Sequence, residues 1–359
     1  MRSIRGASVI LLMCAGALYF LYAGMRSAMD NLAHANKARM AHAAAPARAT
    51  LKPIATIELP GPKGKRFDYL TIDYDDGYLL SAHLGAGLLY VIDLKNHAVV
   101  ATISPVPGVE GVEYVPEFKK AYTSNWHENK IGVVDLKSMK VVARLPTEDK
   151  PDGSAYASDF KKLYVSDERG KAEAVVDVRK DQIIKTLHFD SETGMPQYDP
   201  VAKMVYLNLQ DKNVFAIINP KTDEVVARHP VAPCQGNHGM TLDVKNRRAF
   251  LVCEDNNLMA VFDLDRHRVI ATLPIAEGGD VIKFDEGLGL IYVACYSGAI
   301  SIFKEDDPNR FEKLGDFPTE KKVHSLAVDQ RTHRVYAPEE QAGGNPAARI
   351  VVYEPAINR

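Results

Sequence analysis

The sequence predicts an all-β fold, a seven-bladed β-propeller of four-stranded antiparallel blades. Three observations predict it: a short apolar run recurs along the chain, each recurrence carries four strand-like segments, and no segment after residue 50 has a sustained helical period with caps. The recurring run ends on Asp93, Asp135, Asp177, Asn219, Asp263, Lys304 and Glu354. The first spacing is 135 − 93 = 42 residues, and a period near 42 over seven such runs is typical of propeller blades.

The second repeat shows how one blade is built. It contains four apolar segments, at residues 109–115, 121–125, 131–136 and 141–145. They are rich in Val, Ile and Tyr and are separated by turns that contain Lys, Ser and Asn, as expected for strands joined by hairpins. A unit of four antiparallel strands that repeats at this period is one blade of a propeller.

The last repeat lacks a fourth strand of its own. It stops at Glu354, which is 359 − 354 = 5 residues from the end of the sequence, whereas residues 54–59 ahead of the first repeat have the pattern of a fourth strand. We therefore expect this N-terminal strand to complete the last blade and to remove the free edge of its sheet. Residues 51–359 would then form a single propeller domain.

Residues 1–50 are expected to lie outside the propeller. Arg2 and Arg5 precede an uncharged apolar run at residues 8–25, which indicates either a secretory signal or an N-terminal membrane anchor. An Ala-rich tether follows this run. Basic residues ahead of the run predict that the rest of the chain lies outside the cytoplasm, in the periplasm or beyond, with a membrane tether through residues 8–25 if the run is kept.

The charge distribution excludes one class of partner. The formal net charge is −2, and residues 1–50 contribute +5, so the remainder of the chain carries −2 − 5 = −7. A nucleic-acid binder needs a basic surface along the phosphate backbone. We therefore expect no nucleic-acid partner, and we expect a monomeric body that engages a small molecule or a protein.

The second strands of the repeats carry a family resemblance. The segments AYTSN, LYVSD, VYLNL and IYVAC, which begin at residues 121, 163, 205 and 291, resemble the Tyr-Val-Thr-Asn pattern of the YVTN/YncE-type β-propeller proteins. The resemblance extends over about residues 52–355, with departures at Leu209 and Pro338. It implies an exported, often periplasmic propeller related to the WD40 and YVTN repeats. The matching residues build the blades, so the resemblance does not indicate an activity.

Candidate ligand-binding residues follow from the topology of a blade. Strand one begins, and strand two ends, at the same face of the ring, which here has the longer loops. The residues at strand-one starts are Asp68, Glu110, Asp152, Gln197, His238, Asp280 and His324. Those at strand-two ends are His83, Trp126, His127, Asp167, Glu168, Glu254, Tyr296 and Glu339. From these sets, the selected ligand-binding candidates are Asp68, His83, Glu110, Trp126, His127, Gln197, His238, Glu254, Tyr296 and His324.

Four histidines are predicted on this face, and they raise the question of a metal. His83, His127, His238 and His324, with Glu110 and Glu254 nearby, have the donor types that divalent transition metals prefer. Two of them lie on the innermost strand and two lie one strand further out, about 4.7 Å away, whereas zinc needs every donor within about 2.2 Å. A metal site and ordinary hydrogen-bonded histidines both stay open, and the cofactor is unknown.

Three cysteines lie in the predicted blades. Cys234 precedes strand one of the fifth repeat and Cys253 ends strand two, so both reach the same face and a disulfide between them is predicted for an exported protein. Cys295 stands one repeat later, and a bond between Cys253 and Cys295 is the alternative. Trp126, the one tryptophan, either stacks on a ligand or covers its own loop.

Two functions fit these observations. The first is a binding scaffold without catalysis, because we find no nucleophile elbow, haem-attachment motif or metalloprotease motif. The second is a lactonase-like hydrolase or lyase at the channel mouth. Its base would be His127 or His238, with Glu110 as the partner of the base and Arg66 or Arg169 to hold an anion.

Overall fold

The computed structural model describes residues 49–357. The apolar run at residues 8–25 and most of the predicted tether lie outside the described residues. Within residues 49–357, no helix has the length and apolar character needed to cross a bilayer. The helices of this region are five short 3₁₀ turns: η1 (Leu84–Ala86), η2 (Pro116–Phe118), η3 (Trp126–Glu128), η4 (Gln210–Lys212) and η5 (Glu254–Asn256).

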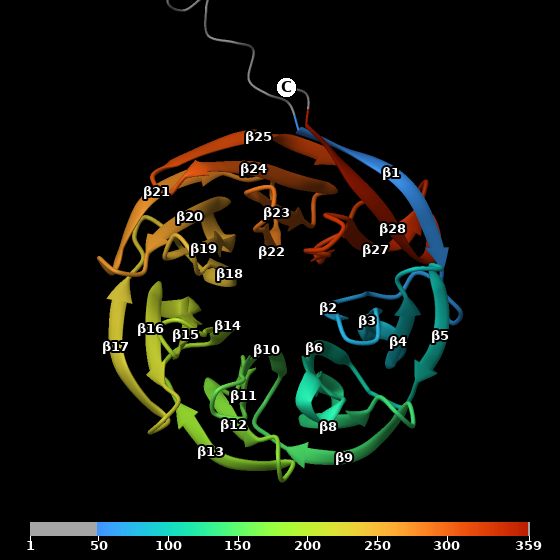
Figure 1. Ribbon diagram of the computed structural model, residues 1–359, viewed down its shortest axis with the longest axis horizontal. Helices are drawn as coiled ribbons and strands as arrows, with labels where there is room; N and C mark the ends of the chain where they lie inside the picture. Colours follow the sequence, from blue (N-terminus) through green and yellow to red (C-terminus); the bar gives the residue numbers. More distant parts are fainter. Residues whose placement is uncertain (1–48, 358–359) are drawn as a thin grey trace, which may run out of the picture. The chain divides into compact units, whose positions relative to one another are not determined.

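Seven four-stranded antiparallel sheets surround a common axis, so the predicted seven-bladed propeller is confirmed (Figure 1). The first blade contains β2 (Leu70–Asp73), β3 (Tyr78–His83), β4 (Leu88–Asp93) and β5 (Ala98–Ile103). The second contains β6 (Val109–Val115), β7 (Lys120–Asn125), β8 (Lys130–Asp135) and β9 (Lys140–Pro146). The third contains β10 (Pro151–Ala157), β11 (Lys162–Asp167), β12 (Ala172–Asp177) and β13 (Gln182–His188). The fourth blade contains β14 (Thr193–Asp199), β15 (Met204–Leu209), β16 (Val214–Asn219) and β17 (Glu224–Pro230). The fifth contains β18 (Asn237–Asp243), β19 (Arg248–Cys253), β20 (Leu258–Asp263) and β21 (Arg268–Pro274). The sixth contains β22 (Gly279–Asp285), β23 (Leu290–Cys295), β24 (Ala299–Asp307) and β25 (Arg310–Pro318).

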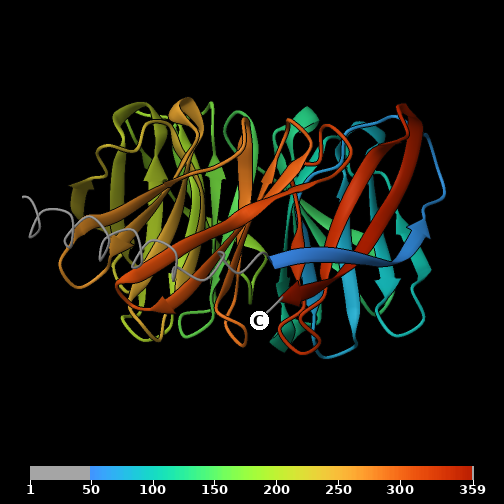
Figure 2. The same cartoon turned by 90° about the horizontal axis from the view of Figure 1, so that it is seen from above.

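The seventh sheet contains strands from both ends of the described chain. Its order is β1-β28-β27-β26, with β1 (Ala49–Glu58), β28 (Asn345–Ile357), β27 (Val335–Ala342) and β26 (Ala327–Val328). β1 runs antiparallel to β28, pairing Thr56 with Val351 and Ile57 with Ile350. Figure 2 shows the two strands, one blue and one dark red, side by side.

Burial along the strands explains why these segments pair as they do. The middle strands β8 and β12 are almost entirely buried, because neighbouring blades cover both of their faces. The outermost strand β9 alternates between exposed and partly buried residues, because only one of its faces meets a blade. The apolar core therefore lies between blades: one cluster joins Leu80 and Val91 of the first blade to Val112 and Val134 of the second.

Candidate functional site

A cavity of about 450 Å³ opens at the face where the innermost strands begin. Seven carboxylate side chains line it: Asp68, Glu110, Asp152, Glu168, Glu254, Asp255 and Asp280. The cationic side chains of this lining are Arg66 and Lys150, and His238 is the lining histidine. With His238 counted as neutral, the formal charge of the lining is 2 − 7 = −5.

β-Bulges position the central side chains of this cavity. The pairing of strand one with strand two is interrupted after Val109, Pro151, Thr193, Asn237 and Gly279, at the start of strand one in five blades. The residues that follow are Glu110, Asp152, Gly194, His238 and Asp280. A bulge turns the local side chain away from the ordinary alternation. The same irregularity therefore directs four side chains, those of Glu110, Asp152, His238 and Asp280, to the cavity. The fifth residue, Gly194 of the fourth blade, has no side chain.

Arg66 and His324 neutralise the carboxylate of Asp68. Arg66 Nη2 lies 2.9 Å from Asp68 Oδ2 and 3.7 Å from Glu110 Oε1. His324 Nε2 lies 3.5 Å from the same Asp68 oxygen. Burial opposes ionisation of Asp68, but the hydrogen bonds and charges of His324 and Arg66 outweigh it, so the pKa of Asp68 is lowered. Asp68 is therefore an ionised, satisfied side chain at the edge of the cavity.

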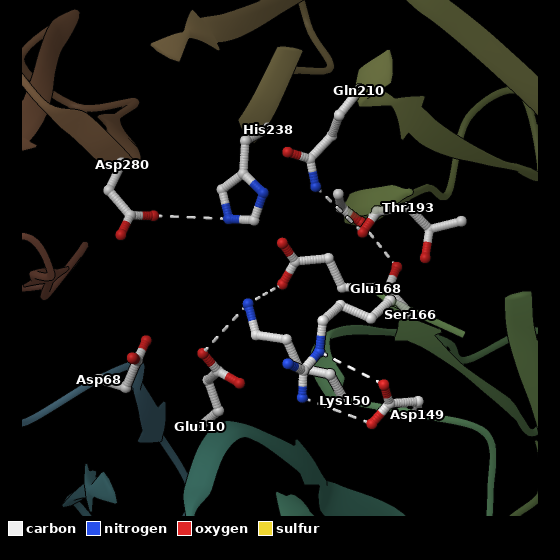
Figure 3. A network of polar contacts seen from close by, with 12 residues as sticks. Asp68, Glu110, Asp149, Lys150, Ser166, Glu168, Thr193, Gln210, His238 and Asp280 are labelled. Carbon is white, nitrogen blue, oxygen red and sulfur yellow. Dashed lines mark hydrogen bonds and ion pairs between the residues drawn. The ribbon is translucent and has the colours of Figure 1, made fainter. Parts of the chain in front are cut away.

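Lys150 joins two other carboxylates (Figure 3). Its Nζ atom forms an ion pair with Glu168 and lies 4.0 Å from Glu110 Oε1. Burial disfavours the charged form of Glu168, but the charges of His238 and Lys150 outweigh it and lower the pKa of Glu168. Lys150 is also 5.2 Å from the centre of the Trp126 ring. The tryptophan therefore packs behind Lys150 and is not part of the cavity lining.

His238 faces the cavity from the start of β18. Its Nε2 atom lies 3.2 Å from Tyr69 Oη and 3.5 Å from Asp280 Oδ1, and its side chain is almost fully buried (Figure 3). Burial alone would lower the pKa of His238. The carboxylates of Glu254, Asp280, Asp152 and Glu168 outweigh burial and raise the pKa to about 9. His238 therefore carries a proton at neutral pH.

Three buried polar atoms of the cavity have no hydrogen-bond partner within residues 49–357. They are Glu110 Oε2, Asp152 Oδ1 and His238 Nδ1. Glu110 and Asp152 are 1% and 3% exposed, and both have a pKa raised well above the ordinary value, first by burial and then by neighbouring carboxylates. A buried acceptor without a donor costs free energy. The cavity thus has acceptors available for a positively charged group.

One group of side chains in the described part of the chain has the geometry to hold a metal ion. Donor atoms of His238, Glu254 and Asp280 all lie within 4.8 Å of one another. Burial and the nearby Asp280 raise the pKa of Glu254 to about 7, although His238 opposes this shift. Imidazole and carboxylate donors together favour a divalent transition metal.

The structure brings together about half of the predicted site residues. Arg66, Asp68, Glu110, His238, Glu254 and Tyr296 line the cavity. Gln197 lies deeper, in a separate small pocket with Glu113 and Lys283. Trp126 and Arg169 lie outside the cavity lining, where Arg169 is 5.2 Å from the Trp126 ring and pairs with Asp149 at 3.4 Å.

The four predicted metal-binding histidines do not come together. His83 is fully buried and stacks on Phe67 at 3.9 Å, and its ring nitrogens contact Tyr90 Oη at 3.1 Å and the Lys65 carbonyl at 3.2 Å. Burial lowers the pKa of His83 to about 4, so its role is packing.

His324 and His127 are also engaged away from His238. His324 Nδ1 donates to the Lys322 carbonyl at 2.8 Å, and the His324 ring stacks on Tyr296 at 4.6 Å. His127 is exposed on η3. The metal-capable group therefore contains one of the four histidines, with carboxylates as its other donors.

The predicted catalytic pairs are not assembled either. Glu110 contacts Arg66 and Lys150, and no contact joins it to His127 or His238 within the described residues. A His238 that is already protonated at neutral pH is a poor general base. Arg66 already pairs with two carboxylates, which leaves it poorly suited to hold an anion.

Sequence reasoning did not predict Tyr69 and Lys150. The sequence does contain a signal for Lys150. It occupies the repeat position that Gly108, Gly236 and Gly278 occupy in other blades, since 108 + 42 = 150 and 236 + 42 = 278. All four have a positive φ, which is 58° for Lys150. Five other lysines, Lys119 and Lys161 among them, also have a positive φ, so the sequence signal is the replacement of a glycine at this repeat position and not the backbone conformation. Tyr69 has no comparable signal.

A disulfide joins Cys234 to Cys253 beside the site. Cys253 is paired with Asn237 across β18 and β19, and Glu254 follows it directly. The bond therefore ties together the two segments that carry His238 and Glu254. Cys295 is the free cysteine of the described residues and is buried.

Comparison with known proteins shows the fold alone. No family model matches the chain, and no curated protein matches its sequence. The solved structure of U3-55K is similar at a TM-score of 0.70, with 10% identity, 84% of this chain and 98% of that chain covered. Kuenenia stuttgartiensis hydrazine synthase is similar at a TM-score of 0.70 with 15% identity, and the match covers 84% of this chain and 97% of that chain. The WD40 repeats of RRP9 are similar at a TM-score of 0.69 with 11% identity, and the match covers 87% of this chain and 99% of that chain. Similar chains number 1757, so the likeness is to a widespread architecture, which does not select a function.

Proposed function

We propose that this protein is an exported propeller of the YVTN/YncE type that binds a small positively charged ligand at its channel mouth. The observation that carries the proposal is the pair of buried acceptors, Glu110 Oε2 and Asp152 Oδ1, which have no partner within residues 49–357 and line a cavity with a formal charge of −5. A cation entering the cavity would satisfy both acceptors and reduce the repulsion among the carboxylates.

The proposal includes export and closure of the ring. The apolar run at residues 8–25 supports a signal or an inner-membrane anchor, and the bond between Cys234 and Cys253 suits an oxidising compartment. In the exported protein, residues 51–359 form the binding domain, and the pairing of β1 with β28 closes the ring. This pairing joins the first and last strands of the propeller in one blade, which holds the ring of blades together around the mouth.

Calorimetric titration of the full chain tests the binding function. The probes are 1,4-diaminobutane as an organic dication, Zn²⁺ as a metal ion and inorganic phosphate as an anion. We expect at least one cation to bind and phosphate not to bind. The double variant Glu110→Gln/Asp152→Asn should weaken the cation at least tenfold, because it removes two of the seven carboxylates of the lining, both of them buried.

The matched control is Asp190→Asn, which removes a carboxylate whose side chain is 81% exposed. This variant should bind the cation as the parent chain does. Binding of phosphate in the absence of any cation binding would contradict the proposal. Equal cation affinity of the double variant and the parent would contradict it as well.

A further inference from the structure

We infer that the cationic ligand includes one divalent transition-metal ion, held by His238 Nε2 and the carboxylates of Glu254 and Asp280. This inference deepens the proposed function and rests on it. The three donors come from two neighbouring blades: His238 begins β18, Glu254 begins η5 after β19, and Asp280 lies at the start of β22. No second group of this kind occurs in the part of the chain that the structure describes.

The spacing of the donors suits an ion of this size. Donors at about 2.0–2.2 Å in a tetrahedral arrangement lie roughly 3.4 Å from one another, and His238 Nε2 is 3.5 Å from Asp280 Oδ1. The carboxylate of Glu254 lies further from His238 Nε2 than Asp280 Oδ1 does, but the donor atoms of all three residues are within 4.8 Å of one another. Its side chain is partly exposed on a short turn, and within residues 49–357 it forms no hydrogen bond, so a small rotation is open to it.

An observation independent of the three donors also indicates a cation. Asp152 is 3% exposed and lines the same cavity, and its Oδ1 atom has no partner within the described residues. Asp152 is also one of the carboxylates whose charge acts on His238. A divalent ion on His238 would place more positive charge beside this buried carboxylate than His238 and Lys150 already supply.

The donor types distinguish the metal class. Ca²⁺ and Mg²⁺ prefer sites made of oxygen donors alone, whereas an imidazole nitrogen with two carboxylates suits Zn²⁺, Mn²⁺ or Fe²⁺. His324 is a poor alternative because Arg66 lies on the same Asp68 carboxylate and would repel the ion. With three protein donors, such a site keeps a coordination position open toward the cavity.

The test uses the full chain, freed of metal with a chelator and titrated with Zn²⁺ in a calorimeter. We expect one ion per chain to depend on this site. His238→Gln should weaken that ion at least 100-fold and Asp280→Asn at least tenfold. His127→Gln, which changes an exposed histidine outside the site in the same way, should leave the affinity unchanged.

The contradicting results are separate from failure of the proposed function. If 1,4-diaminobutane binds but Zn²⁺ does not, the metal inference is wrong and the binding function stands. If neither binds, both are wrong. Zn²⁺ binding that is equal in His238→Gln and the parent, or tighter binding of Ca²⁺ than of Zn²⁺, would each overturn the inference. Thermal unfolding of the metal-free variants checks that they fold, because His238→Gln should melt within a few degrees of the parent.

Discussion

Two sets of buried polar side chains in this propeller behave in opposite ways. On the face opposite the cavity, Lys120 Nζ donates to Asp181 of the next blade at 2.6 Å, and Tyr122 donates to the same carboxylate. One repeat later, Lys162 at 2.6 Å and Tyr164 contact Asp223 in the same way. Each aspartate has one cation and one hydroxyl donor. At the cavity, seven carboxylates share Arg66, Lys150 and the protonated His238, and two of them keep a buried oxygen without a donor.

The difference separates side chains that hold blades together from side chains kept for a ligand. A buried carboxylate with a matching cation and hydroxyl adds to the stability of the blade contact, whereas an unpartnered one lowers the stability of the fold. The 42-residue period places side chains of both sets, since Glu110 and Asp152 are also 42 residues apart, but donors satisfy only the first set. The unsatisfied set is therefore the one that function explains, and each prediction tests that contrast.

The largest effect is expected from removing the disulfide that holds the segments of the site. Cys234 and Cys253 are 19 residues apart in sequence. Closing a loop of that length restricts the unfolded chain by about 3 kcal/mol. Cys234→Ala/Cys253→Ala should lower the free energy of unfolding by that amount in urea denaturation. Cys295→Ala, which removes a buried unpaired thiol one repeat later, is the control and should cost clearly less. Equal losses would contradict a stabilising role for the bond.

A smaller effect is expected at a satisfied carboxylate between blades. Asp223→Asn should lower the free energy of unfolding by about 2 kcal/mol, because one of the donors Lys162 and Tyr164 loses its buried acceptor. Asparagine is chosen because residue 223 has a φ of 54°, which alanine tolerates poorly.

The same Asp223→Asn variant should leave Zn²⁺ affinity unchanged in calorimetry. The exposed Asp190→Asn is its control and should change the free energy of unfolding much less than Asp223→Asn does. A loss of Zn²⁺ affinity in Asp223→Asn would show that the two regions are coupled and that the contrast is too simple.

The sequence predicted the architecture because every blade repeats the same pattern of apolar strands and polar turns. It predicted the cavity less well because the strand-one bulge does not show in apolar patterning. In the fourth blade, Gln197 was expected at the mouth, but it lies deeper, and the residue at the bulge position is Gly194, which has no side chain to offer the cavity. The 42-residue period does predict the bulge position of the fourth blade, because Glu110, Asp152 and Gly194 follow one another at intervals of 42 residues: 110 + 42 = 152 and 152 + 42 = 194.

Strand alternation explains the misplacement of His83. The last residue of strand two points into the blade, as His83, Asn125 and Asp167 do with full burial. The residue after it turns to the mouth, as in Glu168, Glu254 and Tyr296. Successive side chains of a strand face opposite ways, so a shift of one residue decides between core and cavity. Donor convergence across blades, as for His238 with Asp280, is a three-dimensional property that spacing alone does not give.

A still smaller effect, of opposite sign, is expected at an unsatisfied carboxylate. Asp152→Asn should raise the free energy of unfolding of the metal-free chain by about 1 kcal/mol at pH 7.5, because burial and the neighbouring Glu168 disfavour the ionised form of Asp152 and a neutral amide removes that cost. The same variant should bind Zn²⁺ more weakly. Urea denaturation and calorimetry on one preparation measure both effects. A variant that is both less stable and a normal binder would mean that Asp152 belongs with the satisfied carboxylates.

The smallest effect is a pH dependence that arises at the site. Glu254 has a pKa of about 7 in the folded chain and 4.5 as a free side chain, so the stability from its protonation is complete below 4.5 and is lost as pH rises through 7. His238, with a folded pKa of about 9 against 6.5, contributes stability that is complete below 6.5 and is lost as pH rises through 9. Both make the metal-free chain less stable as pH rises from 6 to 9.

Glu254→Gln isolates this contribution from other titrating groups. The substitution removes one titrating group and the largest carboxylate influence on His238, so the fall in stability between pH 6 and 9 should shrink. Glu254 is partly exposed, and solvent screening limits the expected change to about 0.5 kcal/mol. Urea denaturation of parent and variant at pH 6, 7.5 and 9 measures it. If the free energy of unfolding of Glu254→Gln fell more steeply between pH 6 and 9 than that of the parent, the titration of Glu254 and His238 would not be the source of the pH dependence.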